Sequence, residues 1–211
     1  MKKNYAISKF CHVRDSGILL NGQEVFSSGP SEYAPFIKTA YRHLGIQYSK
    51  FFKMDALSKL AFVAAYVILR DEGAADKRNI DLVFSNKASS LHTDRKHWES
   101  MGDVENYYPS PALFVYTLPN ICLGEISIYH KLYSENSFFI FERFNPVYLH
   151  GYANALMDGK TAEKVLCGWV DVDGDKSEAF LYLVEREGSW AHTPTELERL
   201  YDTNGSIKNG T

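Results

Sequence analysis

The chain has 211 residues, of which 45% are hydrophobic, and this is enough for one globular domain with its own core. The net charge is -3, from 23 basic and 26 acidic residues, which argues against a partner such as nucleic acid or an anionic membrane. Three cysteines (Cys11, Cys122, Cys167) are too few for a disulfide framework or a zinc site. The sequence has no apolar export segment at its start and no stretch long enough to span a bilayer. Together these features predict a cytoplasmic protein.

The first part of the chain predicts a strand and two helices. The segment YAISKF indicates a strand, and Asn21-Gly22 is a turn signal in the irregular segment or hairpin that follows it. SEYAPFIKTAYRHLG predicts a short helix that ends at Gly45, and KMDALSKLAFVAAYVILRDEG predicts a longer helix that ends at Gly73. Apolar residues fill nearly every side of the longer helix, so we expect it to be covered nearly all round.

The second part predicts three strands and two helices. IDLVFS indicates a strand, and SPALFVYTLPNICLGEISIYHKL predicts a helix that is kinked or broken at Pro119. SFFIFERFNPVYLHGYANALMDG reads as a buried strand that turns directly into a helix, with Asn145 as N-cap and Pro146 as the first helical residue. EKVLCGWVDV and EAFLYLVE are two adjacent strands, joined by a hairpin at Asp173-Gly174.

This order of elements predicts an α/β fold. We expect a five-stranded, mostly parallel sheet with one antiparallel edge strand and helices on both faces. Residues 1–190 are predicted to form the single domain, and residues 191–211 a C-terminal helix and a frayed tail.

Four segments resemble the N-terminal half of the β-ketoacyl synthases. KMDALSKLAFVAAYVILRDEG, DLVFSNKASSLHTD, SPALFVYTLPNICLGEISI and GKTAEKVLCGWVDV fall in the order seen in that family. The chain is most similar to the short ketoacyl-synthase-like N-terminal-domain proteins of the thiolase superfamily, from about Tyr5 to Glu187. The most specific matches are Pro111, Phe114, Asn120 and Gly124. The resemblance implies a thiolase-like half-fold.

The resemblance also implies that the catalytic residues are missing. In active members of the family, a cysteine at the elbow between strand and helix is acylated. Counting forward from Asn120 and Gly124 puts that position at Arg143 or Phe144, neither of which is a nucleophile. Two further catalytic side chains come from the C-terminal half of the family subunit, which lies outside the resemblance. We therefore expect no catalytic residue and a binding role for the elbow residues Arg143, Phe144, Asn145 and His150.

Other side chains offer weaker candidates for chemistry. Cys122 and Cys167 fall inside a helix and a strand, where cysteines usually act as small hydrophobes. His150 has a plainer interpretation as a hydrogen-bonded histidine at a packed interface. For Arg143 two roles stay open, because its guanidinium at the end of an apolar strand would either seal the vacated acyl site or pair with a carboxylate of a partner.

Two clusters have the composition of metal sites without the required spacing. His92, Asp94 and His97 lack the i, i+4 spacing of ligands on a helix, and a solvated helix start is favoured. The aspartates of DVDGDKSE resemble a calcium loop, but Lys176 and Tyr182 stand where glycine and glutamate are needed, which favours a hairpin turn. We expect no metal and no cofactor.

Two functional hypotheses follow from the resemblance. The first is a non-catalytic subunit, or an acyl-chain or partner-binding protein, that supports a synthase in fatty acid, polyketide or pigment assembly, as chain-length-factor subunits do. The alternative is acyl transfer or 3-oxoacyl synthesis that uses Cys122 or a partner's cysteine. A full-length ketosynthase and an acyl carrier protein are the expected partners.

A homodimer is also expected. The absent second half of the fold would otherwise cover the apolar helix at 54–69 and the helix after the elbow, so that a lone half exposes a large apolar surface. The strand from Ser137 to Glu142 would in addition present an open sheet edge, which a second copy can occupy.

Overall fold

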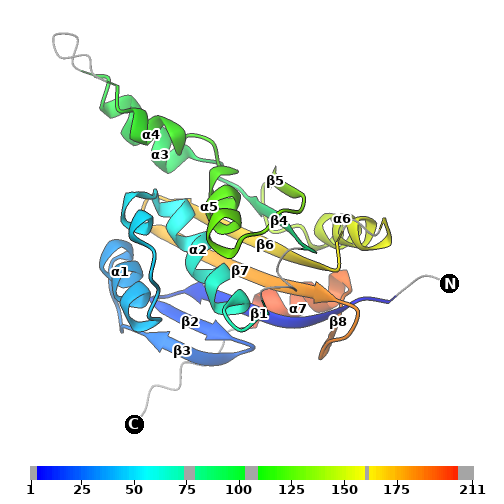
Figure 1. Ribbon diagram of the computed structural model, residues 1–211. Helices are drawn as coiled ribbons and strands as arrows, with labels where there is room; N and C mark the ends of the chain where they lie inside the picture. The colour runs from blue at the N-terminus through cyan, green and yellow to red at the C-terminus, as the bar shows by residue number, and fades with distance from the viewer. Residues whose placement is uncertain (1–3, 74–78, 103–108, 160–161, 204–211) are drawn as a thin grey trace.

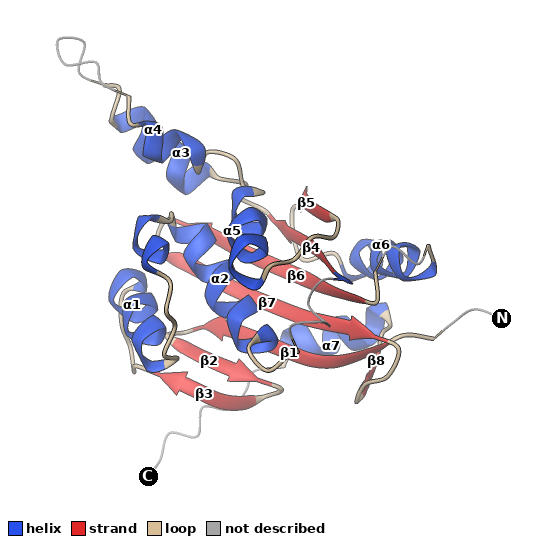
Figure 2. Ribbon diagram, in the orientation of Figure 1, coloured by secondary structure: helices blue, strands red, loops and turns tan. Residues whose placement is uncertain are grey.

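A sheet of eight strands forms the centre of the computed structural model, which describes residues 4–73, 79–102, 109–159 and 162–203 (Figures 1 and 2). The strand order is β3-β2-β1-β7-β6-β4-β5, and the short strand β8 pairs with β1. The strands are β1 (Ala6–Arg14), β2 (Gly17–Leu20), β3 (Gln23–Ser27), β4 (Ile80–Asn86), β5 (Asn136–Ile140), β6 (Lys164–Asp173), β7 (Lys176–Glu185) and β8 (Trp190–Ala191).

The α/β class is confirmed, but the predicted strand count and strand direction are wrong. Strand β4 is parallel to β5 and to β6, and every other pair in the described part of the chain is antiparallel. One cause is local: the chain after β1 turns twice, with Asp15 and Asn21 at positive φ, and adds β2 and β3 to the sheet. The other cause is long-range, because β7 inserts antiparallel between β6 and β1.

Helices cover both faces of this sheet. One face carries α1 (Tyr33–His43), α2 (Ala56–Leu69) and α5 (Ile121–His130), with the 3-10 turn η1 (Ser49–Lys53) beside them. The other face carries α6 (Pro146–Asp158) and α7 (Pro194–Asp202). Two further helices, α3 (Leu91–Glu99) and α4 (Pro111–Val115), form an arm that projects away from the sheet (Figure 1).

Helix α2 is buried within its own chain. Its N-cap Asp55 accepts a hydrogen bond from the backbone of Ser58 at 2.9 Å. Leu60 and Phe62, on different sides of the helix, are both 0% exposed because the sheet, α1 and α5 surround them. The prediction that α2 is covered all round is confirmed. The expectation that another half or another copy must cover it is wrong.

Most of the predicted element boundaries lie within a few residues of the observed ones. Gly45 follows α1 at φ +67°, where glycine has no Cβ penalty. The helix predicted across Pro119 is broken there into α4 and α5, and Gly174 forms the β6–β7 turn at φ +61°. Helix α2 ends at Leu69, before the predicted Gly73, and the predicted frayed tail from 204 onward lies outside the described residues.

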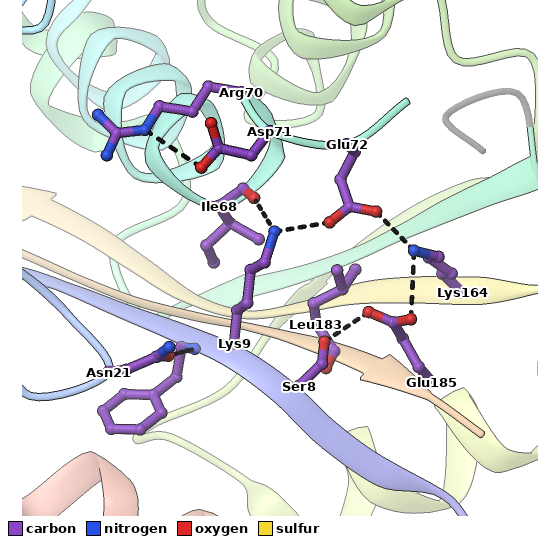
Figure 3. Close-up of polar contacts among 11 residues, drawn as sticks. Ser8, Lys9, Asn21, Ile68, Arg70, Asp71, Glu72, Lys164, Leu183 and Glu185 are labelled. Carbon is purple, nitrogen blue, oxygen red and sulfur yellow. Dashed lines mark hydrogen bonds and ion pairs between the residues drawn. The ribbon is translucent and has the colours of Figure 1, made fainter. Parts of the chain in front are cut away.

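An ionic network fastens the end of α2 to the sheet (Figure 3). Lys9 on β1 donates to the Ile68 carbonyl at 3.3 Å and pairs with Glu72 at 2.6 Å. Lys164 on β6 pairs with Glu72 at 2.5 Å and with Glu185 on β7 at 3.2 Å. Burial acts to raise the pKa of Glu72, but the hydrogen bonds from Lys164 and Lys9 outweigh it, so the pKa lies below its ordinary value.

A buried acid stands at the start of β4. Asp81 is 0% exposed, and its Oδ1 accepts a hydrogen bond from the backbone N–H of Glu135, just before β5, at 3.0 Å. Burial raises the pKa of Asp81 to about 6, against an opposing contribution from that hydrogen bond. The ionised form of Asp81 is therefore disfavoured in the folded protein.

We predict that Glu72→Gln lowers the free energy of unfolding by about 1–3 kcal/mol at neutral pH, because two lysines lose their shared carboxylate. The lowered pKa means that this stabilisation is complete above the ordinary pKa of about 4.5 and is lost as the pH falls through the folded value. Urea unfolding of both proteins across this range measures the difference. Glu24→Gln, on the exposed part of β3, serves as the control, and equal stabilities for Glu72→Gln and the parent would contradict the role of the network.

We predict the opposite sign for Asp81→Asn. A raised folded pKa gives a contribution to stability that is complete below the ordinary value of about 3.8 and is lost as the pH rises through about 6. Asparagine keeps an acceptor for the Glu135 N–H without the charge, so the variant should exceed the parent by about 1–3 kcal/mol at pH 8 and match it near pH 4. Asp71→Asn, at an exposed carboxylate, should leave the curve unchanged. A difference in stability between Asp81→Asn and the parent that does not grow between these pH values would refute the prediction.

Candidate functional site

The predicted elbow lies between β5, which ends at Ile140, and α6, which begins at Pro146. The Asn145 side chain accepts a hydrogen bond from the backbone N–H of Tyr148 at 3.0 Å and so caps the helix, as predicted. The five-residue turn is therefore anchored at its end by this cap and at its start by the Phe141 N–H, which donates to the Asn86 carbonyl at 2.8 Å.

The structure separates the two residues predicted at the nucleophile position. Phe144 is 8% exposed, stacks on Tyr201 of α7 with ring centroids 4.6 Å apart, and meets Phe180 of β7 edge-on at 5.5 Å. Arg143 is exposed, and no hydrogen bond or ion pair to another described residue holds its guanidinium. The side chain that fills the interior at this turn is an aromatic ring.

An open pocket of about 1090 Å³ lies beside the elbow. Its aromatic lining comes from three different parts of the fold: the elbow, β6 and α7. These residues are Phe141, Phe144, Trp169 and Tyr201. Its charged lining is mainly acidic, because the cations Lys87 and Arg143 face five carboxylates: Glu142, Asp171, Glu178, Glu198 and Asp202. This pocket, which we call the elbow pocket, favours apolar groups and disfavours anions.

Two of these carboxylates are fixed in place. Glu178 Oε1 accepts hydrogen bonds from the Trp169 indole at 2.9 Å and from the Tyr201 hydroxyl at 2.8 Å. Asp171 Oδ1 accepts from the backbone N–H groups of Lys87 at 3.1 Å and Ala88 at 2.9 Å. Asp171 and Glu178 are also direct partners in the β6–β7 register, so they carry like charges side by side at the wall of the elbow pocket.

His150 is not among the residues that line the elbow pocket. Its Nε2 lies 3.0 Å from the Asn154 side-chain nitrogen, and the Asn154 oxygen lies 3.0 Å from Nδ1 of His192. Burial, with a smaller contribution from His150, lowers the pKa of His192 to about 3. Of the four predicted binding residues, the structure brings Arg143, Phe144 and Asn145 together at the elbow pocket and places His150 in this separate cluster.

The three cysteines have no access to solvent. Cys11, Cys122 and Cys167 are each 0% exposed, and burial raises the pKa of each thiol. Because the thiolate is the reactive form, these side chains are poor nucleophiles at neutral pH.

The clusters that resemble metal sites have structural partners. His92 and His97 lie five residues apart in α3 and therefore point in different directions, and the His97 ring lies 5.7 Å from Phe114. Asp173 pairs with Arg95 beside the β6–β7 turn. Within the described ranges, no group of three or more His, Cys, Asp or Glu side chains is arranged to hold a metal ion, and none of the helices is long and apolar enough to cross a membrane.

Sequence reasoning missed the contribution of α7 to the elbow. Tyr201 lies 57 residues after Phe144 in the chain, and no local pattern connects them. The sequence signal that could have indicated this contact is the amphipathic pattern of the expected C-terminal helix, in which Leu197 and Leu200 lie on one side. Such a helix packs its apolar side against the rest of the fold.

Comparison with known proteins identifies the fold. No protein-family model and no curated protein matches the sequence. Among solved structures, the ishigamide ketosynthase/chain length factor matches with 18% identity and a TM-score of 0.60, over 86% of this chain and 62% of that chain. A type II polyketide synthase acyl carrier protein in complex with its ketosynthase (AntDE:AntF) matches with 11% identity and a TM-score of 0.63, over 87% of this chain and 62% of that chain.

A third match is a ketosynthase (ApeO) in complex with its chain length factor (ApeC) from Xenorhabdus doucetiae. It has 14% identity and a TM-score of 0.59, and covers 94% of this chain and 90% of that chain. The chain thus spans 62% of the length of the first two matches and nearly the whole length of the third. These likenesses confirm the predicted resemblance at the level of fold: the chain has the thiolase-like fold of the ketosynthases and chain length factors.

Proposed function

We propose that this chain is a non-catalytic, ketosynthase-like subunit that pairs with a full-length ketosynthase, in the way that the Xenorhabdus doucetiae ketosynthase is in complex with its chain length factor. Chain elongation of the fatty acid, polyketide or pigment type is the corresponding setting, and an acyl carrier protein is the partner that would deliver the chain to the ketosynthase.

The observation that carries this proposal is that neither predicted nucleophile position offers a nucleophile: Phe144 is a buried ring and Arg143 an exposed guanidinium. A phenyl ring cannot be acylated, and its contacts with Tyr201 and Phe180 make it part of the core. The described lining of the elbow pocket contains no cysteine, serine or histidine; its one hydroxyl of the threonine type, Thr195, has no histidine beside it in the lining to act as a base. The burial of all three cysteines speaks against the alternative in which this chain supplies its own thiol.

The edge strand β5 is the surface that we assign to the partner. Phe141 N–H donates to the Asn86 carbonyl at 2.8 Å, and the Glu135 carbonyl accepts from Leu82 N–H at 3.0 Å, so the odd-numbered residues of this segment bond to β4. The backbone groups of Ile140, an even-numbered residue, therefore point away from the sheet, and its side chain is 50% exposed. A strand of another subunit would satisfy them.

Exposed apolar side chains extend this surface. Ile128 on α5 and Val147 and Tyr148 on α6 belong to the helices that precede and follow β5. On the projecting arm, Trp98 and Phe114 are 73% and 63% exposed. Because side chains of this size are seldom left in water in such numbers, we assign the arm to the same interface.

The length of the third match supports a subunit of this size. A chain of nearly equal length, matched over 94% of the present one, belongs to a complex of a ketosynthase with its chain length factor. This match therefore supports the proposal that a chain of about this length can serve as one subunit of such a complex.

We predict that neither Phe144→Cys nor Arg143→Cys produces a condensing enzyme. General acid-base assistance and oxyanion stabilisation are each typically worth about 10²–10³-fold or more, and a new thiol supplies neither. Incubation of each purified variant with an acyl thioester and a malonyl thioester, followed by mass spectrometry, should reveal at most an acylated cysteine. Release of a β-ketoacyl product without a second protein would contradict the proposed non-catalytic role.

We predict that the protein made alone is a homodimer through β5, and that Ile140→Pro weakens this dimer. Proline removes an outward N–H and no bond to β4, whereas Ile140→Val keeps that N–H and serves as the matched control. Phe139 is a poorer choice, because its ring packs on Tyr148 and Tyr152 within the subunit at 4.9 and 5.1 Å. Light scattering at low micromolar concentration gives the mass of each protein. A parent protein that is monomeric there would refute pairing of two copies through β5.

Co-expression with a full-length ketosynthase encoded beside this chain tests the pairing itself. We expect a one-to-one complex that survives size-exclusion chromatography and that Ile140→Pro disrupts but Ile140→Val does not. If the ketosynthase elutes alone and elongates chains equally well without this chain, the proposed function is wrong.

A further inference from the structure

A second pocket, of about 780 Å³, lies between the starts of α1, α2 and α3 and the β6–β7 turn. No residue lines both this pocket and the elbow pocket. We call it the helix pocket. His92 and Lys96 of α3 and Leu113 of α4 line it, so it borders the arm that we assign to the partner, but no residue of the elbow or of β5 lines it. An inference about a ligand in it does not require the proposed function.

One part of the helix pocket is apolar. Phe51 and Met54 are 1% and 3% exposed, and Ile37 of α1 is 2% exposed, so these side chains form a packed wall. Tyr33 and Leu113, from α1 and α4, complete it. Such a wall is suited to an aliphatic or aromatic group.

The other part carries three basic side chains that lie close enough to affect one another. Lys59 of α2 and His92 and Lys96 of α3 all line the helix pocket. Burial lowers the pKa of Lys59; the charge of Asp55 opposes this shift and the charge of Lys96 adds to it. Burial also lowers the pKa of His92, and the charge of Lys96 makes the next largest contribution. Within the described part of the chain, none of the three forms a hydrogen bond or an ion pair.

The carboxylates of the helix pocket form no ion pair with this group among the described residues, although the charge of Asp55 acts on Lys59 and His92. Asp55 uses one oxygen to cap α2 at Ser58 and the other to accept the Thr93 hydroxyl at 2.7 Å. Glu32 and Asp175 are exposed, and neither lies within ion-pairing distance of a basic nitrogen among the described residues. Two lysines with unused donors therefore face the same space as the apolar wall.

We infer that the helix pocket binds an amphiphile, with a carboxylate or phosphate head between Lys59 and Lys96 and an aliphatic or aromatic body against Phe51, Met54 and Ile37. An anionic oxygen accepts charge-assisted hydrogen bonds from both lysines and relieves the repulsion between them. The apolar body gains from leaving water. Neither half of the site alone would select this ligand, because a bare anion misses the wall and a neutral chain leaves the lysines unpaired.

Calorimetric titration of the full chain with four probes tests this inference. Decanoate and decyl phosphate carry the two kinds of head, decanol carries the body without the charge, and inorganic phosphate carries the charge without the body. We expect binding of at least one of the two charged amphiphiles at one site per chain, about tenfold tighter than decanol or phosphate. The ratio of the decanoate and decyl phosphate affinities distinguishes a carboxylate ligand from a phosphate ligand. Binding of neither, or equal binding of decanol, would overturn the inference.

Substitutions then locate the site. Lys59→Met and Lys96→Met, which keep most of the side-chain volume, should each weaken binding of the charged amphiphile several-fold and leave decanol unaffected. Lys38→Met on the exposed face of α1 and Arg143→Met in the elbow pocket are the matched controls and should change nothing. Thermal unfolding of each variant without ligand confirms that it is folded. Unchanged binding in the Lys59→Met/Lys96→Met double variant, or loss in Arg143→Met, would refute the assignment to the helix pocket.

Discussion

Closure of both sheet faces by helices of the same chain is the constraint on which the rest of the structure depends. On one face α2 is held between the sheet, α1 and α5, and on the other α6 and α7 pack side by side. Leu197 and Leu200, at 0% and 2% exposure, anchor α7, and each is worth roughly 1.5–3 kcal/mol by burial. Because α7 also brings Tyr201 over Phe144, the same packing that closes the second face closes the elbow. The elbow of this chain is thus a packing site, in which the ring of Phe144 fills the interior between β7 and α7.

Closure of the faces also determines where a partner can bind. With α2 and the inner side of α6 buried, the open features of the described chain include the two sheet edges: β5, like β3 at the opposite end, has one neighbour, and the backbone groups of Ile140 point outward. Asp81 connects this edge to the interior, because the buried carboxyl group fixes the backbone of Glu135 where the chain enters β5. The Asp81 carboxyl group, whose charged form is disfavoured in the fold, therefore lies next to an edge strand of the sheet. The features that favour association are the edge strand and the projecting arm, and not uncovered helices.

Local signals in the sequence predicted the elements well, because each has its cause within a few residues. The cap at Asn145, the helix end at Gly45, the break at Pro119 and the turn at Gly174 all follow from side-chain hydrogen bonding or backbone freedom at one position. Strand direction was not predictable in this way. Strand β7 pairs with β1, which lies more than 160 residues earlier in the chain. Alternating apolar residues indicate that a segment is a strand, but they do not indicate which strand it pairs with. The same limit applies to the site: the elbow was found from its turn, whereas Tyr201 and Glu178, which complete its wall, come from distant elements.

The two pockets differ in a way that follows from what surrounds each of them. At the elbow pocket, Asp171 and Glu178 stand side by side because the β6–β7 register places them opposite one another, and backbone, indole and phenol donors hold one oxygen of each. At the helix pocket, Asp55 caps α2 and accepts the Thr93 hydroxyl, and neither Lys59 nor Lys96 forms an ion pair with a described carboxylate. The elbow pocket therefore has a large excess of carboxylates, whereas the helix pocket offers two lysine side chains with free donors. A single ligand with an anionic head would partition to the helix pocket, so that binding of such a ligand and association through β5 need not compete. Because α3 and α4 of the projecting arm also line the helix pocket, a ligand bound there would contact the arm but not β5.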